Sequence, residues 1–179
     1  MYKHKLLYGM LKLISILFIM AVLFAYITET RRSEFVKYWY FKRNLERVNQ
    51  AVILYAQEND SEMPSALRWA DLVKNNNQLV LKEDFITPMS YPGFGIYFNK
   101  TLENKSLSDI KGNTVVLFTA KGEWNSNGDM KYFREKSDNL KHSYVITLNG
   151  DIYKYRSKND TFLRLKDSQV IDFDALYWE

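Results

Sequence analysis

The apolar positions of the chain change their pattern along its length, and the first pattern is a continuous run. Residues 13–28 contain no charged side chain, and extending the run back to Leu6 adds only Lys12 as an interruption. A helix of the extended length covers about 35 Å, enough to cross a hydrocarbon core of about 30 Å. We therefore predict a transmembrane helix whose membrane anchor is formed by Leu13, Ile14, Leu17, Phe18, Val22 and Leu23.

Two alternatives compete with an uncleaved anchor. A secretory signal peptide shares the basic start and the apolar core, but Ala25 is followed by bulky Tyr26 and Ile27, which makes a poor cleavage site. A helix buried in a soluble protein is the third possibility. The anchor interpretation divides the chain into a transmembrane segment, residues 1–28, and a soluble head, residues 29–179.

The second pattern is the stripe of an amphipathic helix. Residues 29–58 contain neither Pro nor Gly, and large apolar side chains recur at intervals of three and four. We expect this helix packing face to cover the protein's own sheet, and a sharper hypothesis adds contacts with neighbouring copies. The face consists of Tyr38, Phe41, Leu45, Val48, Val52 and Tyr55.

The third pattern is that of strands. Residues 114–120 are apolar and β-branched, which predicts a central strand. Residues 143–148 and 152–156 flank Asn149-Gly150, a strong hairpin signal because both residues tolerate positive φ. With a short helix over 65–75 and further strands near 95–98 and 161–165, the fold class is α+β. We predict a long N-terminal helix, half transmembrane and half amphipathic, packed on a small antiparallel β-sheet.

Several short motifs in this layout resemble the type IV pilin and pseudopilin superfamily, and more narrowly the prepilin-like relatives of the major pseudopilin of type II secretion. The motifs are Asn44-Leu45, Ala51, Tyr55-Ala56, Asn59-Asp60, Pro64, Trp69-Ala70-Asp71-Leu72, His142 and Asn149-Gly150. The resemblance implies a pilin-like fold and subunit packing. The processing motif departs from the family, because Gly9-Met10 is the only candidate cleavage site and Ile14 stands where the family has Glu.

Composition narrows the function classes. The chain has 179 residues and no Cys, which excludes disulfides, iron–sulfur clusters and cysteine nucleophiles. The net charge of +4 comes mostly from Lys3, Lys5 and Lys12, since the rest of the chain has 22 basic and 21 acidic residues. A nucleic-acid-binding domain would concentrate Lys and Arg on its folded part, so we expect no nucleic-acid partner.

No constellation of residues indicates catalysis. His4 and His142 are far apart in the sequence, and a lone His is more often structural than chemical. Residues 125–129 alternate oxygen-bearing side chains, but their glycine offset is wrong for an EF-hand, and a turn is favoured over a calcium site. We therefore expect no enzyme activity, cofactor, metal or small-molecule substrate.

The sequence thus predicts a structural or accessory subunit of a type II secretion or type IV pilus-like system, acting by packing. Its expected location is the inner membrane, single-pass, with the N-terminus cytoplasmic and the head extracytoplasmic. Its expected partners are the membrane and copies of itself or other pilin-like subunits. The alternative is a membrane-anchored module whose exposed aromatics bind a cell-envelope polymer or a partner protein. The candidate aromatics are Tyr91, Tyr132, Phe133, Tyr153, Tyr155, Tyr177 and Trp178.

Overall fold

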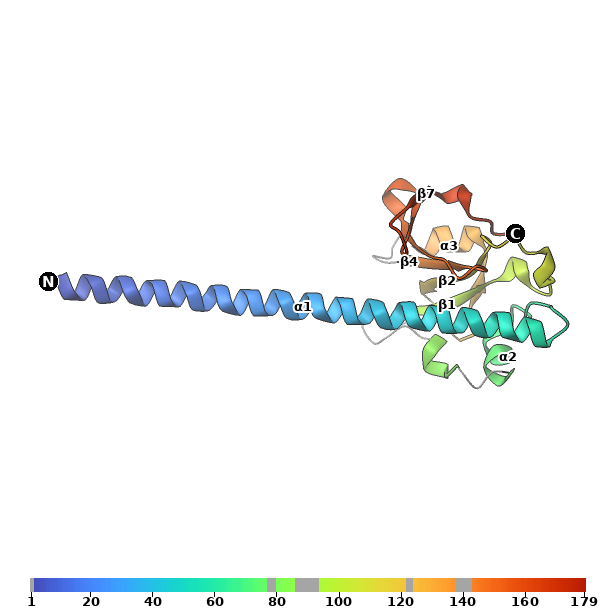
Figure 1. Cartoon of the computed structure of the whole chain (residues 1–179), viewed down its shortest axis with the longest axis horizontal. Coiled ribbons are helices and arrows are strands. Elements are labelled where there is room, and N and C mark those ends of the chain that lie inside the picture. The colour runs from blue at the N-terminus through green and yellow to red at the C-terminus, as the bar shows by residue number, and fades with distance from the viewer. Residues whose placement is uncertain (1, 77–79, 86–93, 122–123, 138–142) are drawn as a thin grey trace. The chain divides into compact units, whose positions relative to one another are not determined.

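A computed structural model describes residues 2–76, 80–85, 94–121, 124–137 and 143–179 (Figure 1). Within the first helix, the side chains of residues 16–29, 39 and 42–58 are described. The chain divides into two compact units, Met1–Tyr40 and Phe41–Glu179.

The elements follow one another in a mixed order. The α-helices are α1 (Tyr2–Glu58), α2 (Trp69–Asn76) and α3 (Met130–Ser137). The strands are β1 (Phe94–Asn99), β2 (Val115–Lys121), β3 (Asn127–Gly128), β4 (Ser143–Thr147), β5 (Ile152–Arg156), β6 (Thr161–Arg164) and β7 (Val170–Asp172). Short 3₁₀ helices are η1 (Lys82–Phe85), η2 (Lys100–Leu102), η3 (Leu107–Asp109), η4 (Ser157–Asn159) and η5 (Phe173–Ala175).

The strands form one seven-stranded sheet in the order β3-β1-β2-β4-β5-β6-β7. Every neighbouring pair is antiparallel except β1 and β3, which run parallel, so the sheet is mixed. The predicted strand over 114–120 is β2, which lies in the interior of the sheet between β1 and β4. The predicted hairpin is also confirmed, because β4 and β5 pair antiparallel on either side of Asn149-Gly150.

An aromatic core fills the face of the sheet that α3 covers. Phe133 of α3 is fully buried and meets Phe118 of β2 edge-on, with ring centroids 5.6 Å apart. The C-terminal segment closes this core, since Trp178 lies 5.2 Å from Phe133 between ring centroids and is buried. The carbonyl oxygen of Trp178 accepts hydrogen bonds from the side chains of Asn99 and Thr101. The last residues of the chain are therefore part of the fold.

The end of α1 belongs to the second unit and is buried there. Leu45, Val48 and Val52 have no exposed surface, and Ala51 and Ala56 are nearly as inaccessible. The amide nitrogen of Asn49 lies 3.4 Å from the carbonyl oxygen of Thr147, which ties α1 to the end of β4. Figure 1 shows this part of α1 and α3 on opposite sides of the sheet.

The predicted fold class is wrong in several respects. The sheet is seven-stranded and mixed rather than small and antiparallel. Only the part of α1 from Phe41 onward belongs to the unit that holds the sheet, so a single long helix packed on the sheet does not describe the fold. Helices and strands are not segregated either, because α3 lies between β3 and β4 in the sequence. The two edge strands are too short to leave a periodic signal, which is why the sequence predicts a smaller sheet.

The predicted transmembrane anchor is also wrong, and with it the single-pass location in the inner membrane. Within the described residues, no helix combines the length and the apolar character that crossing a bilayer requires.

The buried face of α1 yields a first prediction. Leu45→Asp places an unpaired carboxylate where the side chain has no exposed surface. We expect the free energy of unfolding to fall by roughly 4 kcal/mol or more, since both apolar contacts and charge solvation are lost. Urea denaturation of the full chain, followed by tryptophan fluorescence, measures the change.

Leu54→Asp is the matched control, because Leu54 lies on the same helix but is exposed. We expect this variant to lose clearly less stability than Leu45→Asp, because its carboxylate can reach water. Equal unfolding midpoints for Leu45→Asp and the unchanged protein would contradict the described packing.

Candidate functional site

Most of the described side chains of the first unit belong to an apolar segment of α1, residues 16–27. Large apolar side chains occupy every position of this segment except Ala21 and Ala25, with exposed fractions between 48 and 71%. Because an α-helix turns once every 3.6 residues, twelve consecutive positions surround the helix on all sides. The apolar segment therefore has no polar face to present to water.

The residue that follows the apolar segment satisfies its polar group within the helix. The hydroxyl of Thr28 donates to the carbonyl oxygens of Phe24 and Ala25, each at 2.9 Å. A hydroxyl bonded back to the preceding turn needs no partner from a neighbouring molecule. Thr28 therefore extends the surface that can be covered by apolar groups, and Glu29 is the first charged residue after it.

The residues assigned to the membrane anchor fall in or before this segment. Leu17, Phe18, Val22 and Leu23 are all exposed members of it. The side chains of Leu13 and Ile14 lie outside the described residues. Because no helix among the described residues can span a membrane, the exposed apolar surface of this segment requires another explanation.

The residues assigned to the helix packing face behave differently from the apolar segment. Leu45, Val48 and Val52 are fully buried in the second unit, and Tyr55 is half-buried. Tyr38 and Phe41 lie outside the described side chains. Within α1, the described apolar residues are thus exposed in the first unit and mostly buried in the second.

The second unit contains a hydrogen-bonded group at the start of α2, formed by Asp71, Trp124 and Asn125 and called the lock below. The side-chain oxygen of Asn125 accepts hydrogen bonds from the backbone N–H groups of Ala70 and Asp71, at 2.8 and 3.1 Å. These N–H groups belong to the first turn of α2 and have no partner within the helix, so Asn125 caps α2 from a distant loop. Asn125 has a φ of 59°, a conformation that Asn tolerates better than most residues.

The same lock holds the carboxylate of Asp71. The indole N–H of Trp124 donates to Asp71 at 2.8 Å, and the amide of Asn125 donates to its second oxygen at 2.6 Å. These hydrogen bonds, from Trp124 first and then Asn125, hold the pKa of Asp71 below its usual value. The alternating residues 125–129 are thus used for structure, since Asp129 in turn accepts from the N–H of Tyr132 and caps α3.

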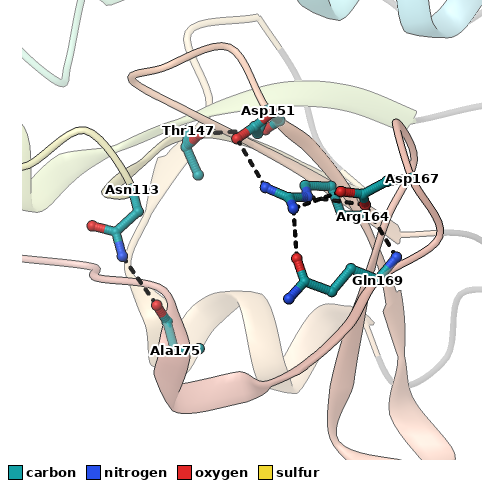
Figure 2. Close-up of polar contacts among 7 residues, drawn as sticks. All are labelled: Asn113, Thr147, Asp151, Arg164, Asp167, Gln169 and Ala175. Carbon is teal, nitrogen blue, oxygen red and sulfur yellow. Dashed lines mark hydrogen bonds and ion pairs between the residues drawn. The ribbon is translucent and has the colours of Figure 1, made fainter.

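A second polar cluster, the Arg164 cluster, joins β6 to the turn before β5 (Figure 2). Arg164 contacts Asp167 through two nitrogens at 3.1 and 2.6 Å, and a third nitrogen lies 3.6 Å from Asp151. Gln169 completes the cluster by accepting from Arg164 at 2.5 Å. Arg164 lowers the pKa of Asp167, and the guanidinium is fully engaged by its own chain. This cluster stabilises the turn between β6 and β7, and its guanidinium is not free to bind an external anion.

Neither cluster has the composition of a reactive centre. Among the described residues, no three His, Cys, Asp or Glu side chains are placed to hold a metal ion. His142 and Tyr91 lie outside the described residues, as does the side chain of His4.

The aromatic residues considered for polymer binding are mostly structural. Phe133, Tyr153, Tyr155 and Trp178 are buried in the core. Tyr132 is half-buried and stacks on Tyr97, and their hydroxyl oxygens are 3.1 Å apart. Tyr177 is exposed, with the ammonium of Lys111 4.0 Å from its ring centroid. The described members of this set do not form a row of exposed rings. Tyr153 and Tyr155 alternate onto the same face of β5, and both are buried in the core.

Comparisons with protein-family models, with curated proteins and with solved structures find no match to this chain.

The lock around Asp71 predicts a specific response to acid. The pKa of Asp71 is lower in the folded protein than the ordinary Asp pKa of about 3.9, so the ionised carboxylate stabilises the fold at pH values above that ordinary pKa. This stabilisation is lost as the pH falls through the lower pKa of the folded state. We expect Asp71→Asn to lower stability at neutral pH and to weaken the loss of stability on acidification. Urea midpoints measured between about pH 6 and pH 3 give both quantities.

Trp124→Phe is the partner variant, because it removes the donor to Asp71 and keeps an aromatic ring beside Phe85. In a double-mutant cycle, we expect Trp124→Phe to change the pH dependence of stability in the unchanged protein. In the Asp71→Asn background, the same substitution should change it little. Fully additive effects, or an unchanged pH dependence in Asp71→Asn, would refute the assigned role of this carboxylate.

Proposed function

We propose that the protein is a structural assembly subunit, which acts by packing its apolar segment against other subunits and not by catalysis. The observation that carries this proposal is the exposure of large apolar side chains on every side of residues 16–27. Soluble monomers rarely expose contiguous apolar patches beyond a few hundred Å². A helix that is apolar all round is normally enclosed, so this segment requires neighbours.

Copies of the same chain are the partner that the segment fits best. The segment is uncharged from Ile16 to Thr28, so identical segments can lie together without bringing like charges into contact. One neighbouring helix covers only one side of a helix, and full enclosure therefore requires several copies. A bundle of apolar segments from several copies satisfies this requirement.

The resemblance to pilins and pseudopilins supports the same class of function, because those proteins also act by packing helices in an assembly. The finer proposal, a subunit of a type II secretion or type IV pilus-like system, rests on that resemblance alone. The alternative, a module that binds a polymer through exposed aromatics, has less support because most of the candidate rings are buried.

Cysteine scanning tests the assembly directly, because the chain has no native Cys. Single substitutions Leu17→Cys, Phe18→Cys, Ile19→Cys and Met20→Cys sample one full turn of the exposed helix. Under mild oxidation in detergent-free buffer, we expect intermolecular disulfides at those of the four positions whose side chains face their counterparts in a neighbouring copy. Leu67→Cys, on the exposed surface of the second unit, is the control and should remain largely monomeric on a non-reducing gel.

Sedimentation velocity adds a quantitative measure. Leu23→Glu places a charge in the apolar segment, and we expect it to weaken self-association at least about tenfold in dissociation constant. Leu67→Glu should leave association unchanged. Cross-linking as strong at position 67 as in the segment would indicate non-specific aggregation and contradict the proposal. A monomer that instead enters phospholipid vesicles would overturn it in favour of a lipid partner.

A further inference from the structure

The chain contains the tripeptide Asn-Gly-Asp twice, at Asn127-Gly128-Asp129 and at Asn149-Gly150-Asp151. Asn followed by Gly is the sequence most prone to cyclise, because a glycine places no side chain in the way of the attacking backbone nitrogen. The covalent chemistry available to the two sites is the same. Any difference in their behaviour must therefore come from the fold.

The second tripeptide lies in an exposed turn. Asn149 and Gly150 are both exposed, and Gly150 has a φ of 83°, which belongs to the region that glycine adopts without strain. No heavy atom lies within 4 Å of the position that a Cβ on Gly150 would occupy. The side of Gly150 on which a Cβ would stand is therefore open to solvent.

The first tripeptide is held in the sheet. The side-chain amide of Asn127 donates to the carbonyl oxygen of Ala66 at 2.9 Å, which fixes its orientation. Gly128 is buried in β3, and a Cβ placed on it would lie 2.8 Å from the ring of Tyr132. Cyclisation would have to displace both the amide and the surrounding side chains.

We propose that Asn149 is a site of spontaneous covalent modification, deamidation through a succinimide, and that Asn127 is protected from it. The backbone nitrogen of Gly150 attacks the side-chain carbonyl carbon of Asn149 and gives up its proton. The bond from that carbon to the amide nitrogen breaks, and ammonia leaves with the proton. Water then opens the ring at either carbonyl, which yields Asp or the β-linked isoaspartate.

Two hydrogen bonds hold the turn in its folded conformation. The N–H of Gly150 donates to the carbonyl oxygen of Thr147 at 2.9 Å, and the N–H of Asn149 donates to Gly112 at 2.9 Å. The attack requires the first of these bonds to open. Opening an exposed turn at the end of a hairpin disturbs fewer buried contacts than opening β3, so the reactive conformation is more accessible at Asn149.

The modification alters a defined contact. The side chain of Asn149 lies so close to Gly112 that an added Cβ there would come within 2.4 Å of its oxygen. Deamidation puts a negative charge on this side chain, two residues from Asp151 of the Arg164 cluster. The isoaspartate product also lengthens the main chain by one atom, which is incompatible with the bonds that dock the turn on Gly112 and Thr114.

Peptide mapping by mass spectrometry of the full chain tests the proposal. The protein is incubated at mildly alkaline pH and 37 °C, once folded and once in urea, and the two Asn-Gly-Asp peptides are followed in time. In the folded protein, we expect deamidation at Asn149 to be at least about tenfold faster than at Asn127, because the two sites differ in their local opening. In urea, the two rates should converge, since the two tripeptides are identical.

Isoelectric focusing of two variants gives an independent readout. Asn149→Gln should abolish the acidic species that accumulates in the folded protein, whereas Asn127→Gln should leave it in place. Equal rates at the two sites in the folded protein would overturn the inference. So would a folded protein in which Asn149 stays intact while both sites react in urea.

Discussion

The packing of Phe133 against other aromatic rings is the contact on which most of the second unit depends. This one side chain of α3 meets rings from three strands, from the 3₁₀ helix η5 and from the C-terminus. The partners are Phe118, Tyr155, Phe162, Phe173 and Trp178, with ring centroids 5.2 to 6.3 Å from that of Phe133. Since aromatic side chains bury large apolar areas, elements far apart in the sequence are joined by a single cluster.

Polar side chains stabilise the N-terminal ends of the short helices α2 and α3. An eight-residue helix has little stability by itself, and its first N–H groups lack partners. Asp129 supplies an acceptor for α3 from the preceding position, while Asn125 supplies one for α2 from more than fifty residues away. The loop that carries Asn125 thereby connects α2 to the sheet, and the oxygen-rich motif serves as two helix caps.

Elements with a strong local pattern could be predicted from the sequence. The apolar run of β2 and the Asn149-Gly150 hairpin both appear where the pattern indicates, because their signals are contained within a few residues. Helix α3 and the edge strands β3 and β7 could not be predicted. The sequence of α3 is mostly polar, and it forms a helix because Phe133 and the cap at Asp129 hold it in place. The buried role of Tyr153 and Trp178 likewise depends on contacts with residues distant in the sequence.

The contrast within α1 bears most directly on function. In the second unit, only one face of α1 is buried. Leu45, Val48 and Val52 form an apolar stripe on that face, and the opposite side of the helix is mostly polar. The apolar segment has no such stripe, because its large side chains point in every direction. An apolar stripe can be buried against the protein's own sheet. A helix that is apolar on every side is buried only when other groups surround it completely. The proposed assembly of several copies would supply such surroundings to the apolar segment.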